Sequence, residues 1–301
     1  PFTVNDINFE ADLIVGKSTS DTEYWIWSDS VRGYDKSLKS NTNDGETSGT
    51  TYTSVGSSGY SSHNNRFSNG RTYTTWAWNA GSSTVTNTAG DHATTVRANL
   101  ETGFSIVKFT VPSTSGLVAY GHGLATEPSL VITKRTDSSG NWMVFTDLTG
   151  SSNYFNLNTM ADATSTESYF AKSDSTFSLQ NGHYTDTGWD IISYCFAPVA
   201  GFSNFGTYSG GTNPKVITCG FEPTLVIIKK TDSSNHWLMI DSERGGTKKV
   251  ALDQDVEEND LSTIGDATQN IVVFESDGFK LTTTNGPSNS SGGTYIYAAW
   301  A

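Results

Sequence analysis

The chain alternates short apolar runs with clusters of small polar residues, a pattern that indicates β-strands joined by turns. The run Leu225–Lys229 is continuous and rich in β-branched residues, which fits a buried strand. The cluster "TDSSN" that follows has turn composition, and "HWLMID" then resumes a strand, so we predict a β-hairpin with a loop of about 4–6 residues. Lys229 and Lys230, at the end of the first strand, are expected to lie in solvent. Apolar residues never recur at helical spacing over a long window, so no long helix is predicted.

The same hairpin phrase occurs three times along the chain. "PTLVIIKKTDSSNHW" at residues 223–237 is matched by "PSLVITKRTDSSGNW" at residues 128–142 and, more distantly, by "ADLIVGKSTSDTEYW" at residues 11–25. An alignment without gaps superposes a leucine, a tryptophan and a glycine of each copy: Leu13, Leu130 and Leu225; Trp25, Trp142 and Trp237; Gly33, Gly150 and Gly245. The copies end in "TYTTWAWNAG", "DIISYCFAPVAG" and "TYIYAAWA", which place Trp78, Phe196 and Trp300 in one column. This indicates one unit of about 100 residues in three copies.

Each copy holds about seven or eight short strands, which a two-sheet antiparallel β-sandwich accommodates well. We predict an all-β protein with three tandem β-sandwich units, residues 1–82, 103–200 and 201–301. Residues 83–102 are mostly small and polar and are expected to form a linker or a surface ribbon. The tryptophan of each hairpin is expected to cap the core of its own unit. The second and third units open with "GFSIVKFT" and "GFSNFGTY", whereas the first has no such strand. This predicts a processed or truncated N-terminus, or a strand that another segment supplies.

Several of these stretches also resemble a known group of proteins. "FEADLIVGK", "WIWSDSVRG", "HGLATEPSLVITKRTDSSGNW" and "GGTYIYAAWA" are similar to repeat domains in large virion proteins of marine tailed bacteriophages, cyanophages among them, which are described as tail-fibre-like or virion structural proteins. The resemblance covers almost the whole chain through short, dispersed motifs. It implies a fibre-like or capsid-surface protein that assembles with itself, as a trimer, and with other virion proteins. It carries no catalytic residues.

Charge and composition narrow the range of partners. A formal net charge of −13 and a sequence pI of about 4.7 would repel a polyanion, so nucleic-acid binding is not expected. No apolar stretch approaches the roughly 18 residues that span a bilayer, and no signal peptide is visible, so membrane insertion is not expected. Cys195 and Cys219 lie in apolar, strand-like runs, and we expect two buried free thiols rather than a disulfide scaffold.

The residues that could carry chemistry each have a simpler explanation. "DSVRG" at residues 29–33 and "DSERG" at residues 241–245 predict local Asp–Arg pairs that pin a turn, and the second copy, "TDLTG", lacks the arginine. The acidic stretch "DQDVEEND" at residues 253–260 could hold Ca²⁺ through carboxylate oxygens, but it lacks the spacing of a calcium loop. The histidines show no metal-ligand spacing and are expected to be solvated loop residues: His63, His92, His122, His183 and His236.

Exposed aromatic residues are the remaining candidates for ligand binding. Tyr60, Tyr154, Tyr169, Tyr184 and Tyr208 lie in Ser-, Gly- and Asn-rich surroundings and could stack on sugar rings, although cross-strand packing explains each of them as well. The resemblance to virion proteins implies a non-enzymatic virion structural protein, without a cofactor, that lies on the surface of an extracellular particle and contributes to host attachment. A carbohydrate-binding module or lectin that recognises host envelope glycans, and a bacterial surface adhesin, stay open as alternatives.

Overall fold

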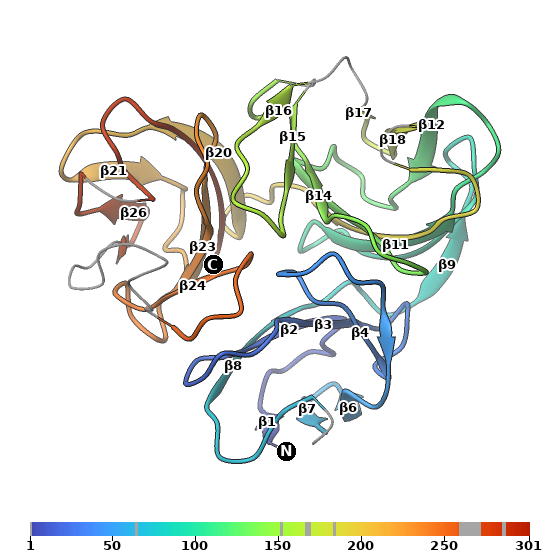
Figure 1. Cartoon of the computed structure of the whole chain (residues 1–301), viewed down its shortest axis with the longest axis horizontal. Coiled ribbons are helices and arrows are strands. Elements are labelled where there is room, and N and C mark those ends of the chain that lie inside the picture. The colour runs from blue at the N-terminus through green and yellow to red at the C-terminus, as the bar shows by residue number, and fades with distance from the viewer. Residues whose placement is uncertain are drawn as a thin grey trace.

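The chain folds into three lobes around a common centre, as the computed structural model shows (Figure 1). The structure describes residues 2–63, 66–150, 153–165, 170–182, 185–258, 272–284 and 287–301. These residues form antiparallel strands and turns without a helix, so none of them belongs to a helix that could cross a membrane. The prediction of an all-β protein is confirmed for the described residues.

The strands of each lobe are short, as the spacing of turn residues predicts. The first lobe holds β1 (Thr3–Asn5), β2 (Leu13–Ser18), β3 (Ile26–Asp29), β4 (Lys36–Ser37), β5 (Thr47–Ser48), β6 (Tyr52–Gly56), β7 (Gly59–Ser62) and β8 (Tyr73–Trp78). The second holds β9 (Thr84–Asn87), β10 (Thr94–Asn99), β11 (Phe104–Thr110), β12 (Gly116–Gly121), β13 (Leu130–Arg135), β14 (Met143–Phe145), β15 (Asn153–Asn156), β16 (Thr164–Ser165), β17 (Phe170–Lys172), β18 (Thr176–Asn181) and β19 (Asp190–Phe196). The third holds β20 (Ser203–Ser209), β21 (Lys215–Thr218), β22 (Leu225–Lys230), β23 (Trp237–Asp241), β24 (Lys249–Ala251), β25 (Val272–Glu275), β26 (Gly278–Leu281) and β27 (Thr294–Trp300).

Each lobe has an inner sheet near the centre and a second, three-stranded sheet. The inner sheets have the orders β3-β2-β8, β16-β15-β14-β13-β19-β11-β10-β9 and β20-β27-β22-β23-β24. The second sheets have the orders β1-β7-β6, β12-β18-β17 and β21-β26-β25. The predicted hairpin is β22–β23, and β2–β3 and β13–β14 are its counterparts. The same register also joins each hairpin to the last strand of its lobe, because Leu13 pairs with Trp78, Leu130 with Phe196 and Leu225 with Trp300.

Within the inner sheets, β2, β13 and β22 are buried on both faces, which explains the continuous apolar runs of these strands. One side of β22 places Val226 and Ile228 in the core of the third lobe, between its two sheets. The other side places Leu225 in a central cluster that residues of all three lobes share. Each lobe therefore has its own core, and a fourth core lies where the lobes meet.

Residues 83–102, for which a linker or a surface ribbon was predicted, contain the paired strands β9 and β10, which we call the ribbon. β10 pairs with β9 on one side and with β11 on the other, so the ribbon widens the inner sheet of the second lobe. It also fastens that lobe to the first one, because Arg97 forms an ion pair of 2.6 Å with the buried carboxylate of Asp12. The ribbon is thus part of the folded structure rather than a flexible linker.

Candidate functional site

Three aromatic rings meet at the centre of the molecule. Trp78, Phe196 and Trp300 contact one another edge to face, with ring centroids 6.1, 5.9 and 5.5 Å apart and interplanar angles of 71°, 73° and 70°. One ring comes from the last strand of each lobe. Edge-to-face packing is a favourable arrangement for aromatic side chains, so this trio joins the three lobes at a single point.

The tryptophans of the hairpins fasten each lobe to its neighbour. Trp25, Trp142 and Trp237 are buried in the central cluster, and their indole N–H groups donate to backbone carbonyls of another lobe. The acceptors lie in three segments that we call the arms, residues 38–46, 155–163 and 250–258. The bonds are Trp25 to Ala251 O (2.9 Å) and Gln254 O (3.0 Å), Trp142 to Lys39 O (2.8 Å) and Trp237 to Asn156 O (3.0 Å).

The three contacts form a closed ring. The first hairpin receives the arm of the third lobe, the second hairpin the arm of the first lobe, and the third hairpin the arm of the second lobe. Backbone bonds repeat the same order, from Glu23 N to Asp255 O, from Gly140 N to Asn43 O and from Asn235 N to Met160 O. The prediction that each tryptophan caps the core of its own unit is therefore wrong. Its sheet has a second apolar face, and the neighbouring lobe covers that face.

Three lysines lie beside these tryptophans and follow the same order. Lys17, Lys134 and Lys229 are at most 1% exposed. Their ammonium groups donate to carbonyls of the neighbouring arm: Asp255 O at 3.1 Å, Asn43 O at 3.4 Å and Met160 O at 2.9 Å. Burial lowers the pKa of each of these lysines to about 8, because a charged ammonium loses its hydration there. The prediction that Lys229 lies in solvent is wrong, since the arm of the second lobe covers it.

The local Asp–Arg pairs predicted from "DSVRG" and "DSERG" are confirmed, and they also reach another lobe. Arg32 contacts Asp29 at 2.5 Å, and the hydroxyl of Tyr194, in the second lobe, donates to the same carboxylate at 2.8 Å. Burial disfavours the charged guanidinium, but Asp29, Tyr194 and Glu46 together outweigh this effect and raise the pKa of Arg32. This pair is therefore part of the contact between the first and second lobes.

The second pair makes the equivalent contact between the third and first lobes. Arg244 contacts Asp241 at 2.7 Å and lies 5.2 Å from the ring centre of Trp76, whose indole N–H donates to Asp241 at 3.3 Å. In the third lobe, the residue that corresponds to Tyr194 and Trp76 is Ala298, which has no ring. The equivalent segment of the second lobe, "TDLTG" at residues 146–150, has no arginine. The arginine thus occurs where the next lobe presents a polar aromatic ring, which explains why one copy does without it.

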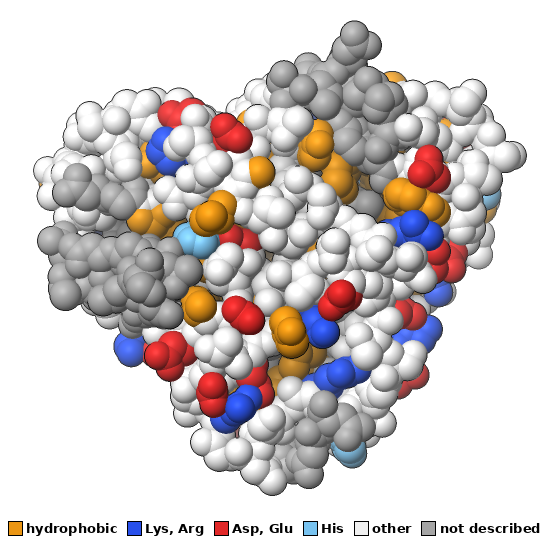
Figure 2. All heavy atoms as spheres, in the orientation of Figure 1, with side chains coloured by type: hydrophobic (Ala, Val, Ile, Leu, Met, Phe, Trp, Pro, Cys, Tyr) orange, Lys and Arg blue, Asp and Glu red, His pale blue; other side chains and the backbone are white. Residues whose placement is uncertain are grey.

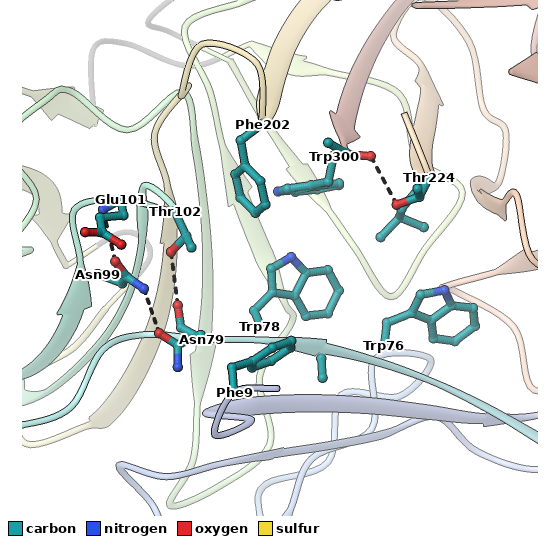
Figure 3. A pocket seen from close by; sticks show the side chains of 13 residues that line it. Phe9, Trp76, Trp78, Asn79, Asn99, Glu101, Thr102, Phe202, Thr224 and Trp300 are labelled. Atoms are coloured by element: carbon teal, nitrogen blue, oxygen red, sulfur yellow. Dashed lines mark hydrogen bonds between the residues drawn. The ribbon is translucent and has the colours of Figure 1, made fainter. Parts of the chain in front are cut away.

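A cavity of about 480 Å³ opens beside the aromatic trio (Figure 3). Phe9, Trp76 and Trp78 of the first lobe form one wall, and Phe202 and Trp300 of the third lobe form the other. The polar rim comes from the ribbon and the end of β8. Its hydrogen bonds run from Asn99 Nδ2 to Asn79 Oδ1 (2.6 Å), from Thr102 Oγ1 to Asn79 O (3.0 Å) and from Glu101 N to Asn99 Oδ1 (3.0 Å).

The other candidates from the sequence lie outside this junction or are buried. Gly33, Gly150 and Gly245 have φ angles of 98°, 97° and 81°, so the turn after each hairpin uses a left-handed backbone that glycine adopts readily. Both cysteines are buried free thiols, as predicted, and burial raises the pKa of Cys219 to about 11.

Two histidines differ from the prediction of solvated loop residues. His122 is fully buried, accepts the amide of Leu124 on its Nδ1 and contacts Ser173 O through Nε2; burial lowers its pKa. His236 is buried against Asp253, with 2.7 Å between Nδ1 and the carboxylate. In the described part of the acidic stretch, Asp253 also accepts the amide of Trp237, and no cluster of metal-ligating side chains occurs among the described residues.

The three tyrosines of this set that the structure describes do not form an exposed platform. Tyr60 and Tyr208 are buried in the cores of their lobes, and Tyr154 is half-buried beside Phe145, so the prediction of exposure is wrong for the first two. Tyr169, Tyr184 and His183 lie outside the described residues, as do residues 259 and 260 of the acidic stretch. On the face seen in Figure 2, acidic and basic side chains are scattered over the lobes and do not gather in one patch.

Sequence reasoning missed the lysines and the arms. The lysines had a signal, because each follows the aligned leucine by the same offset in Leu13–Lys17, Leu130–Lys134 and Leu225–Lys229. The arms also had one, because Asn41, Asn158 and Asp253 follow the hairpin tryptophans by the same offset and accept their backbone amides. The contacts of the arms with the neighbouring lobe had no signal, because they use backbone carbonyls, which every residue carries.

The fold and the junction define an all-β protein whose three lobes are locked together by equivalent aromatic and lysine contacts. The chain belongs to the family described as Domain of unknown function (DUF7483), whose model matches residues 2–301. No curated protein and no solved structure matches the chain.

Proposed function

We propose that this chain is a structural protein on the surface of a tailed-bacteriophage particle, where it contributes to host attachment and catalyses no reaction. In this proposal the three lobes are homologous β-sandwich units, the first of which lacks its opening strand. The observation that carries the structural part is the closed ring of contacts that Trp25, Trp142 and Trp237 make with the three arms. The virion location rests on the resemblance of the sequence motifs.

The placement of the buried polar groups supports a mechanical role. Lys17, Lys134 and Lys229 donate to carbonyl oxygens at the junction, and Arg32 is enclosed by Asp29 and Tyr194. The separation of polar groups that are buried and paired in this way requires a large free energy, because each group would lose its partner before water could replace it. Such a junction resists pulling on any one lobe, which suits a part of a particle exposed to shear.

Self-assembly and partners belong to the same proposal. We propose a homo-oligomer, in the first instance a trimer, that is fixed to other virion proteins and can contact host-surface glycans. Sedimentation velocity of the purified chain at several concentrations measures the oligomeric state directly. A monomer at all concentrations would contradict the proposed trimer. The single chain with its three lobes would then be the unit that assembles.

The decisive experiment is to locate the protein on particles. Antibodies against the purified chain are bound to particles of a phage that encodes it, and electron microscopy shows where they attach. Labelling of fibres or of the capsid surface, together with slower adsorption to host cells, is the expected result. If mass spectrometry of purified particles does not detect the protein, the proposal is contradicted. Binding of the purified chain to isolated envelope glycans, without presence on particles, would favour the lectin alternative instead.

A further inference from the structure

The inner sheet of the first lobe has an open edge where the other two lobes have a strand. β19 lies between β13 and β11, and β27 lies between β22 and β20. β8 is the corresponding strand of the first lobe, and among the described residues it pairs with β2 alone. An unpaired edge is a template for another extended chain, because its backbone donors and acceptors are already aligned.

The backbone groups at this edge lack the partners that the other lobes provide. Asp12 N donates to Trp78 O at 2.8 Å, so the backbone N–H and C=O groups of Trp78 point toward β2. The backbone groups of its neighbours Ala77 and Asn79 therefore point away from β2, toward the open edge. The residues that correspond to Asn79 are Ala197, which donates to Gly103 O at 2.7 Å, and Ala301, which donates to Phe202 O at 2.8 Å. The amide of Asn79 has no such acceptor among the described residues.

The aromatic ring of Trp78 at this edge differs from its counterparts in the other two lobes, each of which packs on a phenylalanine of the adjacent strand. In the second lobe Phe104 of β11 stacks on Phe196, with centroids 4.7 Å apart and an interplanar angle of 25°. In the third lobe Phe205 of β20 packs on Trp300 at 5.6 Å. Beside Trp78, the third ring of the trio, lies the cavity of about 480 Å³ (Figure 3). This volume is large enough for a phenylalanine side chain.

Burial along the three strands agrees with this difference. From the second residue onward, every residue of β19 and β27 is buried. In β8 only Trp76 is buried, and the other residues are half-buried. The sequence of β8 is as aromatic as theirs, so the exposure comes from the missing neighbour and not from a polar strand.

We propose that the β8 edge binds an extended strand of a partner polypeptide, which runs antiparallel to β8 and places an aromatic side chain in the cavity beside Trp78. The expected pattern is that of β11, with an aromatic residue at the position of Phe104 and apolar residues on both faces of the strand. The added strand continues the inner sheet and extends the established contact of the aromatic trio. Glu101 lines the cavity at this end of the edge, and the whole chain carries a net charge of −13, so a basic strand is favoured. This inference stands whether or not the chain belongs to a virion.

A synthetic peptide with the sequence of residues 102–111, "TGFSIVKFTV", tests the proposal. The peptide is titrated into the full chain by calorimetry, and amide hydrogen exchange is measured with and without it. We expect saturable binding and slower exchange at Ala77 and Asn79. A peptide with Phe104→Ala should bind about tenfold or more weakly, because the ring that fills the cavity is lost.

Two N-methylated peptides provide matched controls. Since Ala197 N donates to Gly103 O, the odd-numbered residues of β11 direct their backbone groups toward β19. Methylation of the Val107 nitrogen should therefore prevent binding, whereas methylation of the Ile106 nitrogen should leave it largely intact. Absence of binding, equal binding of the two methylated peptides, or protection that appears only away from residues 73–79 would each overturn the proposal.

Discussion

Replacement of Trp142 by phenylalanine isolates one contact of the central ring. The indole N–H of Trp142 donates to Lys39 O in the arm of the first lobe at 2.8 Å, and the side chain is fully buried. Phenylalanine keeps an aromatic ring against Trp27 but cannot donate a hydrogen bond. Because the ring is smaller, it also leaves a small void between the second lobe and the arm.

The cost can be worked out from these two losses. A buried carbonyl without its donor costs about 1–3 kcal/mol. The smaller ring adds about 1–2 kcal/mol for lost contacts and the void. We therefore expect the free energy of unfolding to fall by about 2–5 kcal/mol, which lowers the melting temperature by about 3–8 °C for a chain of this length.

Thermal and urea unfolding, each followed by fluorescence and by circular dichroism, measure the effect. Because the three hairpin–arm contacts form a closed ring, we expect one transition that both probes report and that shifts as a whole. Trp189→Phe is the matched control, since Trp189 lies under Arg135 in the second lobe and outside the central cluster. An equal shift for both variants, or a separate early transition of a single lobe, would refute the reasoning.

Three further predictions concern buried ionisable groups. Arg32→Thr leaves the Asp29 carboxylate buried without its ion-pair partner and should lower the free energy of unfolding in urea by about 3–5 kcal/mol. The double variant Asp29→Thr and Arg32→Thr, which copies the residues of the second lobe, should lose less stability. A double variant that is no more stable than the single one contradicts this. The native pKa of Lys134, about 8, lies below its ordinary value of 10.5, so the unfolded state binds more protons between these values and the contribution of Lys134 to stability rises as the pH increases through this window. The difference in the free energy of unfolding between the wild type and Lys134→Met should therefore increase by about 1 kcal/mol per pH unit between about pH 8 and 10. The titration of cysteines and tyrosines cancels in this difference, because both proteins contain them. A difference that stays constant with pH contradicts the lowered pKa of Lys134. Cys195 and Cys219 should react with a disulfide reagent far more slowly in the native chain than in urea, because burial raises the pKa of both thiols; rapid native labelling of either would contradict its burial.

Local patterns in the sequence were sufficient for the strands and the turns. The apolar run of β22 and the turn after it predict the hairpin, since these depend on neighbouring residues alone. The equal offsets among Leu225, Trp237 and Gly245 and their counterparts also place the strand pairs in the same register. The sequence shows no counterpart of "GFSIVKFT" in the first copy, and among the described residues β8 pairs with β2 alone.

Only the tertiary structure decided what the second face of each inner sheet contacts. A continuous apolar run indicates burial on both faces but does not say which part of the chain provides the cover. The partners of Trp142 and Lys134 are backbone carbonyls about a hundred residues away, and a carbonyl leaves no trace in the choice of side chain. For the same reason the sequence could not distinguish three units in a row from three lobes closed around an aromatic trio. That closure turns lysines with a surface-like pattern into buried contacts of the junction.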